Sequence, residues 1–181
     1  MKHLLYTFFL GTSILVFSCK NETSTKQPEV KTPPTETGTI DEGVVEDVSF
    51  KTKSTKIAFE NYIALKNALV NTDAAQTKEK AKIFMKNIKN VKEINPKINK
   101  ILKEILEAET IDKQRQSFGD LTSFMENMIA GDIIEGAVFK QFCPMAFKNR
   151  GAYWLSNSKE IRNPYFGDKM LKCGRVAEEI N

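Results

Sequence analysis

Apolar residues recur at helical spacing through the middle of this chain, and this pattern constrains the fold more than any other feature. Steps of three or four residues place side chains on one face of an α-helix. Four such stripes lie between residues 54 and 131: Ala58, Tyr62, Leu65 and Leu69; Ala81, Phe84, Ile88 and Val91; Ile98, Ile101, Leu102 and Ile105; and Phe118, Leu121, Met125 and Met128. They predict a mainly α fold, in which four amphipathic helices with short links form an up-down bundle.

The expected helix ends carry residues that commonly cap helices. Side chains of Ser, Thr, Asp and Asn accept hydrogen bonds from the first free N–H groups, and a proline at the first helical position has no N–H to leave unpaired. The predicted starts are Ser54 or Thr55, Asp73 (with Gln76 completing a capping box), Asn95 with Pro96, and Thr110, and Gly131 is placed to end the fourth helix.

The methionines and the charged residues of the predicted helices are expected to have structural roles only. Met85, Met125 and Met128 stand among Leu and Phe at helical spacing, where methionine usually fills gaps in a core. Arg115 and Glu126 are expected on the solvent-facing side, because charged side chains are seldom buried.

The N-terminal segment is typical of an exported protein. Its apolar stretch, Leu4 to Phe17, is shorter than the roughly 20 residues that a membrane-spanning helix needs. The run Val16-Phe17-Ser18-Cys19 resembles a loose lipobox, in which cleavage precedes a cysteine that then carries lipid. We therefore expect a lipoprotein signal peptide over residues 1–18, a lipidated Cys19, and a disordered Thr-, Glu-, Lys- and Pro-rich tether over residues 19–53. The expected location is the cell envelope, on the periplasmic face of the outer membrane.

Export also narrows the possible chemistry. His3 is the chain's single histidine and would leave with the signal peptide. The mature chain would then lack Ser-His-Asp and Cys-His nucleophile pairs and the HExxH zinc motif, and it has no GxxxxGK[ST] loop for a nucleotide phosphate. The net charge is +4, with lysines scattered among Glu and Asp, which gives no basis for a nucleic-acid partner. We expect a protein that is not an enzyme.

The C-terminal part, residues 132–181, is rich in glycine and aromatic residues. Residues 137–142 have the branched and aromatic content of a short strand, and residues 163–167 (Asn-Pro-Tyr-Phe-Gly) read as a turn. The domain is thus expected over residues 54–181, with the bundle at 54–131 and a cap of loops and a short strand at 132–181.

Besides the lipidated Cys19, two cysteines remain free in the expected mature chain, and each has a methionine close by. Cys143 is followed by Pro144 and Met145, and Met170 precedes Cys173 by three positions. Thiolate and thioether sulfurs are soft donors suited to Cu(I), whereas zinc would ordinarily recruit four Cys or His ligands that the chain does not have. These four sulfur residues are therefore candidate ligands of a soft metal ion.

Three alternatives for the cysteines stay open at this point. A disulfide between Cys143 and Cys173 is common in exported proteins, and closing a loop of about 30 residues would stabilise the fold by roughly 3–4 kcal/mol. Free buried thiols are a second possibility. A thiol oxidoreductase would need a thiolate of lowered pKa, for which Lys172 beside Cys173 is the only support.

Several runs in this part resemble a known family when taken together. They are Gln141-Phe142-Cys143-Pro144-Met145-Ala146, Gly151-Ala152-Tyr153-Trp154-Leu155-Ser156, Glu160-Ile161-Arg162-Asn163-Pro164-Tyr165-Phe166-Gly167 and Met170-Leu171-Lys172-Cys173-Gly174. With Tyr62–Leu69 and Gln114-Arg115 before Phe118, they resemble the domain-of-unknown-function family DUF3347 over residues 55–180. That family occurs in lipoproteins of Gram-negative bacteria and at the C-termini of periplasmic adaptor subunits of heavy-metal efflux pumps.

The resemblance implies an envelope protein associated with the efflux of copper or other soft cations, and it favours metal binding over a plain disulfide. We expect a lipoprotein that binds Cu(I) for buffering or for delivery to heavy-metal efflux components. The alternative is a disulfide-stapled, non-enzymatic interaction module. The resemblance carries over Cys143, Met145, Met170 and Cys173 as ligands, and Pro144, Trp154, Asn163, Pro164, Gly167 and Gly174 as the scaffold around them.

Overall fold

The computed structural model describes residues 47–91 and 95–181, and all of them fall within one compact unit of the chain, residues 39–181. The expected signal peptide, Cys19 and most of the expected tether lie outside the described residues. No helix in the described ranges combines the length and apolar character that crossing a membrane requires.

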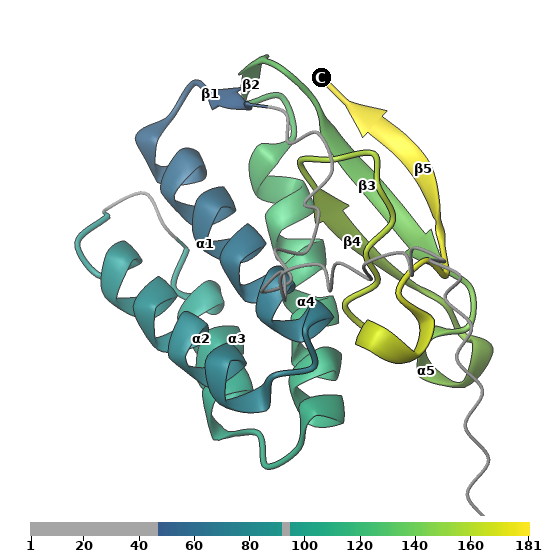
Figure 1. The fold of residues 1–181 in the computed structure, drawn as a ribbon. Helices are drawn as coiled ribbons and strands as arrows, with labels where there is room; N and C mark the ends of the chain where they lie inside the picture. The colour runs from purple at the N-terminus through teal and green to yellow at the C-terminus, as the bar shows by residue number, and fades with distance from the viewer. Residues whose placement is uncertain (1–46, 92–94) are drawn as a thin grey trace, which may run out of the picture. The chain divides into compact units, whose positions relative to one another are not determined.

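Four long helices form the first part of the fold, as Figure 1 shows: α1 (Lys53–Val70), α2 (Ala74–Ile88), α3 (Lys97–Glu107) and α4 (Ile111–Ile129). α1 packs on α2, α2 on α3, α3 on α4, and α4 also contacts α1. Every residue of the four predicted stripes is buried except Val91 and Met128, which are partly exposed. The mainly helical fold is confirmed.

The helix starts follow the predicted caps in two cases, with cap bonds from Gln76 N to Asp73 Oδ1 (2.8 Å) and from Lys113 N to Thr110 Oγ1 (3.3 Å). α3 begins one residue later than predicted: Pro96 is its N-cap instead of its first residue, and Asn95 Oδ1 accepts from Lys97 N at 2.9 Å from one position before the cap. The first start was wrong by two or three residues. Thr52 caps α1, its hydroxyl accepting from the N–H of Thr55 at 3.2 Å, and it also donates to Asp132 Oδ2 at 3.1 Å. This second partner comes from a distant segment, and neither Ser54 nor Thr55 has it.

Two antiparallel sheets complete the fold. Strand β1 (Ser49–Phe50), in the stretch expected to be a tether, pairs with β2 (Ile133–Glu135). The other sheet has the order β4-β3-β5, with β3 (Val138–Cys143) between β4 (Ala152–Ser156) and β5 (Arg175–Ile180). The cap is therefore built on a three-stranded sheet, with β2 in addition, rather than on loops with one short strand.

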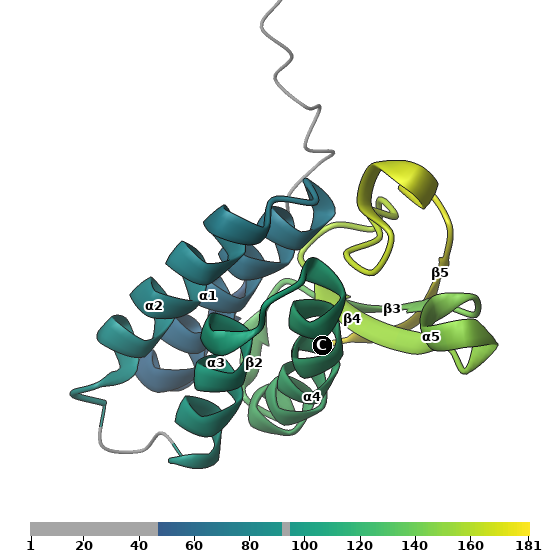
Figure 2. The same ribbon diagram turned by 90° about the horizontal axis from the view of Figure 1, so that it is seen from below.

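The helices and the three-stranded sheet share one core. Figures 1 and 2 show the four helices on one side and strands β3, β4 and β5 on the other, with α4 against β4. Tyr62 of α1 links them, because its buried hydroxyl accepts from the N–H of Leu155 at 3.0 Å and lies 2.8 Å from Thr122 Oγ1. Two short elements lie beside the sheet, α5 (Ala146–Asn149) and the 3₁₀-helix η1 (Gly167–Met170).

Candidate functional site

Strand pairing brings the two cysteines together. Cys143 is the last residue of β3 and Cys173 lies two residues before β5, and Phe142 pairs with Arg175 where the two strands meet. The Sγ atoms are 3.5 Å apart, and both cysteines are free thiols. Cys143 is buried and Cys173 is partly exposed, so the pair is reached from the Cys173 side.

The sulfur separation can be compared with what each chemistry requires. A disulfide needs about 2.05 Å between sulfurs. With a metal–thiolate bond of about 2.3 Å, a tetrahedral ion would hold two sulfurs about 3.8 Å apart and a linear one about 4.6 Å apart. The observed 3.5 Å is nearest to the tetrahedral value. It is also the distance of a hydrogen bond between two thiols, so the separation alone selects neither a shared ion nor a disulfide.

The electrostatics of Cys173 oppose a reactive thiolate. Burial raises the pKa of the Cys173 thiol, and its hydrogen bond with Cys143 raises that pKa further. The Lys172 ammonium pairs with the Glu160 carboxylate. A thiol oxidoreductase uses a thiolate of lowered pKa, which is the opposite of the shift at Cys173.

The two methionines are placed differently. Met170 ends η1, and its carbonyl accepts from the N–H of Cys173 at 3.0 Å, so its backbone lies one turn from the thiol. Met145 is 45% exposed and lines a pocket of about 240 Å³ with Asp112 and Arg115, to which neither cysteine contributes. Of the four predicted ligands, the structure thus brings Cys143 and Cys173 into contact and places Met170 three residues before Cys173. Met145 is turned toward α4.

No group of three or more His, Cys, Asp or Glu side chains in the described part of the chain is placed to hold a metal. A third or fourth ligand at the cysteine pair would accordingly be a thioether or a small molecule from outside.

Trp154 forms the inner wall beside the cysteines. It pairs with Gln141 while Cys143 pairs with Ala152, so Trp154 and Cys143 are diagonal neighbours on one face of the sheet. The indole is fully buried, and its Nε1 has no hydrogen-bond partner among the described residues. A Cβ at Gly174, where φ is +147°, would stand 2.8 Å from Trp154 Cη2, so this close approach requires glycine.

The Asn-Pro-Tyr-Phe-Gly turn holds the backbone of Cys173. Asn163 is fully buried, its Nδ2 donates to the Cys173 carbonyl at 2.8 Å, and its Oδ1 accepts from Tyr165 N at 2.8 Å. Gly167 closes the turn with φ of +57°, and a Cβ there would lie 2.0 Å from Thr72 Oγ1. Pro144 stands in the turn that follows β3.

Arg115 is a positioning residue that the sequence interpretation missed. The expectation of a solvent-facing side chain is wrong, because Arg115 is only 7% exposed. Its guanidinium donates to the carbonyl of Pro164 at 2.9 Å, to that of Leu69 at 3.4 Å and to Thr72 Oγ1 at 3.3 Å. These acceptors compensate for its burial and tie α4 to the turn that holds Cys173. The sequence signal that could have identified Arg115 was the Gln114-Arg115 pair, which is part of the family resemblance.

Comparison with known proteins supports the helical part of the resemblance. Residues 58–135 match the model of a family described as "Protein of unknown function (DUF3347)". The match runs from α1 through β2 and ends before Cys143, so it is shorter than the 55–180 expected. No curated protein and no solved structure matches the chain.

Proposed function

We propose that this protein, whose residues 58–135 match the DUF3347 family model, is a non-enzymatic envelope lipoprotein that binds a soft metal ion, with Cu(I) as the first candidate, through Cys143 and Cys173. The observation that carries the proposal is the contact of two free thiols at 3.5 Å from positions 30 residues apart. Soft thiolates favour Cu(I) among the common biological cations.

Thioethers complete the proposed coordination. Met170 is adjacent through the backbone of Cys173, and Met145 reaches the cysteines after rotation out of its pocket at α4. Because the pKa of Cys173 is raised, its thiol keeps its proton at neutral pH until an ion displaces it. The indole of Trp154 keeps water from the inner side of the pair.

The cellular role in this proposal rests on the export signal and the family resemblance. The lipid on Cys19 and the tether hold the domain at the membrane, and the four helices act as an up-down bundle that supports the sulfur-bearing cap. The bound ion is then buffered or passed to heavy-metal efflux components.

A competition titration with a chromogenic Cu(I) chelator under anaerobic conditions tests the proposal. The full chain carries Cys19→Ser, so that only two thiols are present. We expect this protein to withdraw one equivalent of Cu(I), and the variant with Cys143→Ser and Cys173→Ser to withdraw none. Met125→Leu, a buried core methionine, is the matched control and should bind like the parent. Equal binding by the parent and the double-serine variant would refute the proposal.

A disulfide-stapled interaction module is the second candidate, favoured by the same sulfur contact in a compartment that oxidises thiols. Thiol counting on protein purified without reductant separates the two. Two thiols that react only after reduction support the stapled module, and two reactive thiols support the metal site.

A further inference from the structure

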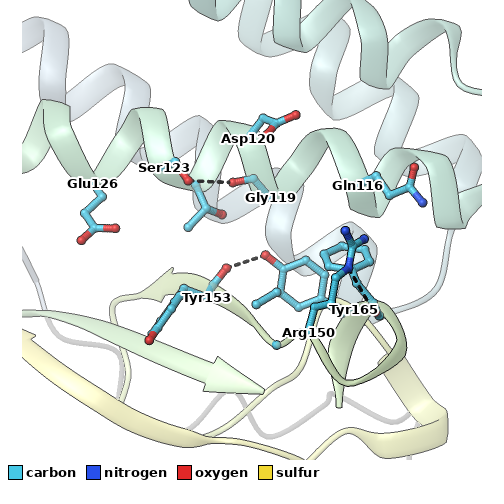
Figure 3. A pocket seen from close by; sticks show the side chains of 12 residues that line it. Gln116, Gly119, Asp120, Ser123, Glu126, Arg150, Tyr153 and Tyr165 are labelled. Carbon is cyan, nitrogen blue, oxygen red and sulfur yellow. Dashed lines mark hydrogen bonds between the residues drawn. The ribbon is translucent and has the colours of Figure 1, made fainter. Parts of the chain in front are cut away.

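A second concave site lies on the opposite side of α4 from the helical core, away from the cysteines. It is a groove of about 500 Å³ between α4 and the turn that leads from α5 to β4, shown in Figure 3. α4 contributes Gln116, Gly119, Asp120, Thr122, Ser123 and Glu126, and the facing wall has Phe147, Arg150, Gly151, Ala152, Tyr153 and Tyr165. Neither cysteine nor a methionine lines it, so the proposed metal site does not account for it.

Gly119 keeps the wall of this groove open although packing does not demand a glycine. It lies within α4, and a Cβ built there would approach nothing closer than 3.9 Å, at Phe147 Cε2 and Tyr165 OH. Alanine would therefore fit, and in a helix interior it would be more stable than glycine by about 0.5–1 kcal/mol. The glycine thus lowers the stability of α4 at a position where a larger side chain would begin to fill the groove.

The facing wall is held in an unfavourable backbone conformation. Phe147, Lys148 and Asn149 have φ of 52°, 59° and 65°. Asparagine tolerates this left-handed region, but Phe147 and Lys148 each cost about 1–2 kcal/mol there. This turn places the Phe147 ring and the Arg150 side chain at the groove. Strain of this kind is concentrated at functional sites.

Arg150 has unused hydrogen-bonding capacity. Its Nε donates to the Phe147 carbonyl at 3.2 Å and its guanidinium lies 6.0 Å from the Phe147 ring centroid, but no Asp or Glu of the described residues forms an ion pair with it. An arginine can hold a carboxylate through two parallel hydrogen bonds. Arg150 is thus available to a carboxylate brought by a ligand.

The opposite charge lies along α4. Figure 3 shows Glu126 pointing from the helix toward the facing wall, with Arg150 below the Gln116 end, while Asp120 stands at the far edge of the helix. Lys140 forms an ion pair with Glu126 and neutralises part of its charge. From Gln116 to Glu126 the helix rises about 15 Å at 1.5 Å per residue, and an extended peptide covers that length in about four residues.

We propose that this groove binds an extended peptide segment of about four residues from a partner protein, with an acidic side chain on Arg150 and a basic side chain facing Glu126. The open wall at Gly119 admits the peptide backbone, and the Phe147 and Tyr153 rings flank it. The site is independent of the cysteine pair.

The test uses the full chain, reduced and metal-free, titrated with acetyl-Glu-Ala-Ala-Lys-amide and with acetyl-Lys-Ala-Ala-Glu-amide while backbone amide shifts are followed by NMR. We expect one of the two peptides to bind with a Kd below about 1 mM and to shift the amides of Gly119 and Gly151. Gly119→Leu should weaken binding at least about tenfold, Gly119→Ala less than about threefold, and Arg150→Gln about fivefold.

Thermal unfolding shows whether each variant is folded. If Gly119→Leu does not fold, the two other single variants, Gly119→Ala and Arg150→Gln, still test the proposal. The proposal is overturned if neither peptide shifts a groove amide at about 10 mM, or if Arg150→Gln binds as the parent does. It is also overturned if sedimentation shows that the groove variants abolish self-association while the peptides fail to bind, because the occupant would then be a second copy of the chain.

Discussion

Replacing Arg115 with methionine tests whether the helices hold the turn that carries Cys173. Methionine keeps most of the length and apolar packing of arginine but removes its donors. The carbonyl of Pro164 would lose its donor at 2.9 Å, and the carbonyl of Leu69 would keep a bond from Thr72 N at 3.1 Å. The damage should therefore concentrate at the turn that contains Pro164.

The size of the effect follows from these groups. A buried acceptor left without a partner costs about 1–3 kcal/mol, and the weaker bonds to Leu69 and Thr72 add about 0.5 kcal/mol each. Methionine also removes the cost of burying the guanidinium charge, a cost that is evident because burial lowers the pKa of Arg115. This gain offsets part of the lost stability. The net loss should be about 2 kcal/mol, or a fall in Tm of about 6–8 °C for a domain of this size.

Urea and thermal unfolding followed by Trp154 fluorescence measure this loss. Asp112→Asn is the matched control: it removes the ion pair at 3.4 Å between Asp112 and Arg115, but the Asp112 side chain is 83% exposed, so we expect a change below about 0.5 kcal/mol. Arg115→Met should also speed the reaction of Cys173 with a thiol reagent, because the Pro164 turn holds its backbone. Equal destabilisation by the two variants would refute this account of Arg115.

Three further predictions concern the same region. Gly167→Ala should destabilise the fold by more than about 2 kcal/mol in urea unfolding, and Thr72→Ala should not restore it, because φ of +57° and the Val70 carbonyl 2.8 Å from the new Cβ remain. Apparent Cu(I) affinity should rise at least about tenfold per pH unit between about pH 6 and 8, because the raised pKa of Cys173 makes each binding event release its proton; a flat profile would contradict this. Oxidation to a Cys143–Cys173 disulfide should raise stability by about 3–4 kcal/mol in calorimetry, an increase that Cys143→Ser abolishes.

The helical half could be predicted because its determinants are local. Stripes at helical spacing and side-chain caps such as Asp73 and Thr110 act within one or two turns, and all four long helices form where they occur. The error at Thr52 has a non-local cause. Its hydroxyl bonds to Asp132, 80 residues away, and no local pattern shows that contact.

The sheet was harder to predict for the same reason. β5 (Arg175–Ile180) is almost wholly exposed and carries Glu178 and Glu179, so neither alternation nor β-propensity marks it as a strand. It becomes a strand because β3 offers it an edge. Without that pairing the sequence could suggest that Cys143 and Cys173 meet, but it could not determine how, nor could it show that Met145 turns toward α4.

The cap and the helices stabilise each other, which affects how the metal proposal should be tested. A division at residue 131 would separate β1 from β2, Tyr62 from the backbone of Leu155, and Arg115 from the Pro164 carbonyl. Each contact satisfies a buried or paired backbone group that water would have to replace. A fragment holding only residues 132–181 would therefore lose the contacts that hold the Cys173 turn, and its metal affinity would describe a different molecule. Arg115 stands 28 positions before Cys143 and hydrogen-bonds to neither cysteine. A loss of Cu(I) affinity in Arg115→Met with both thiols intact would therefore show that the helices position the sulfurs.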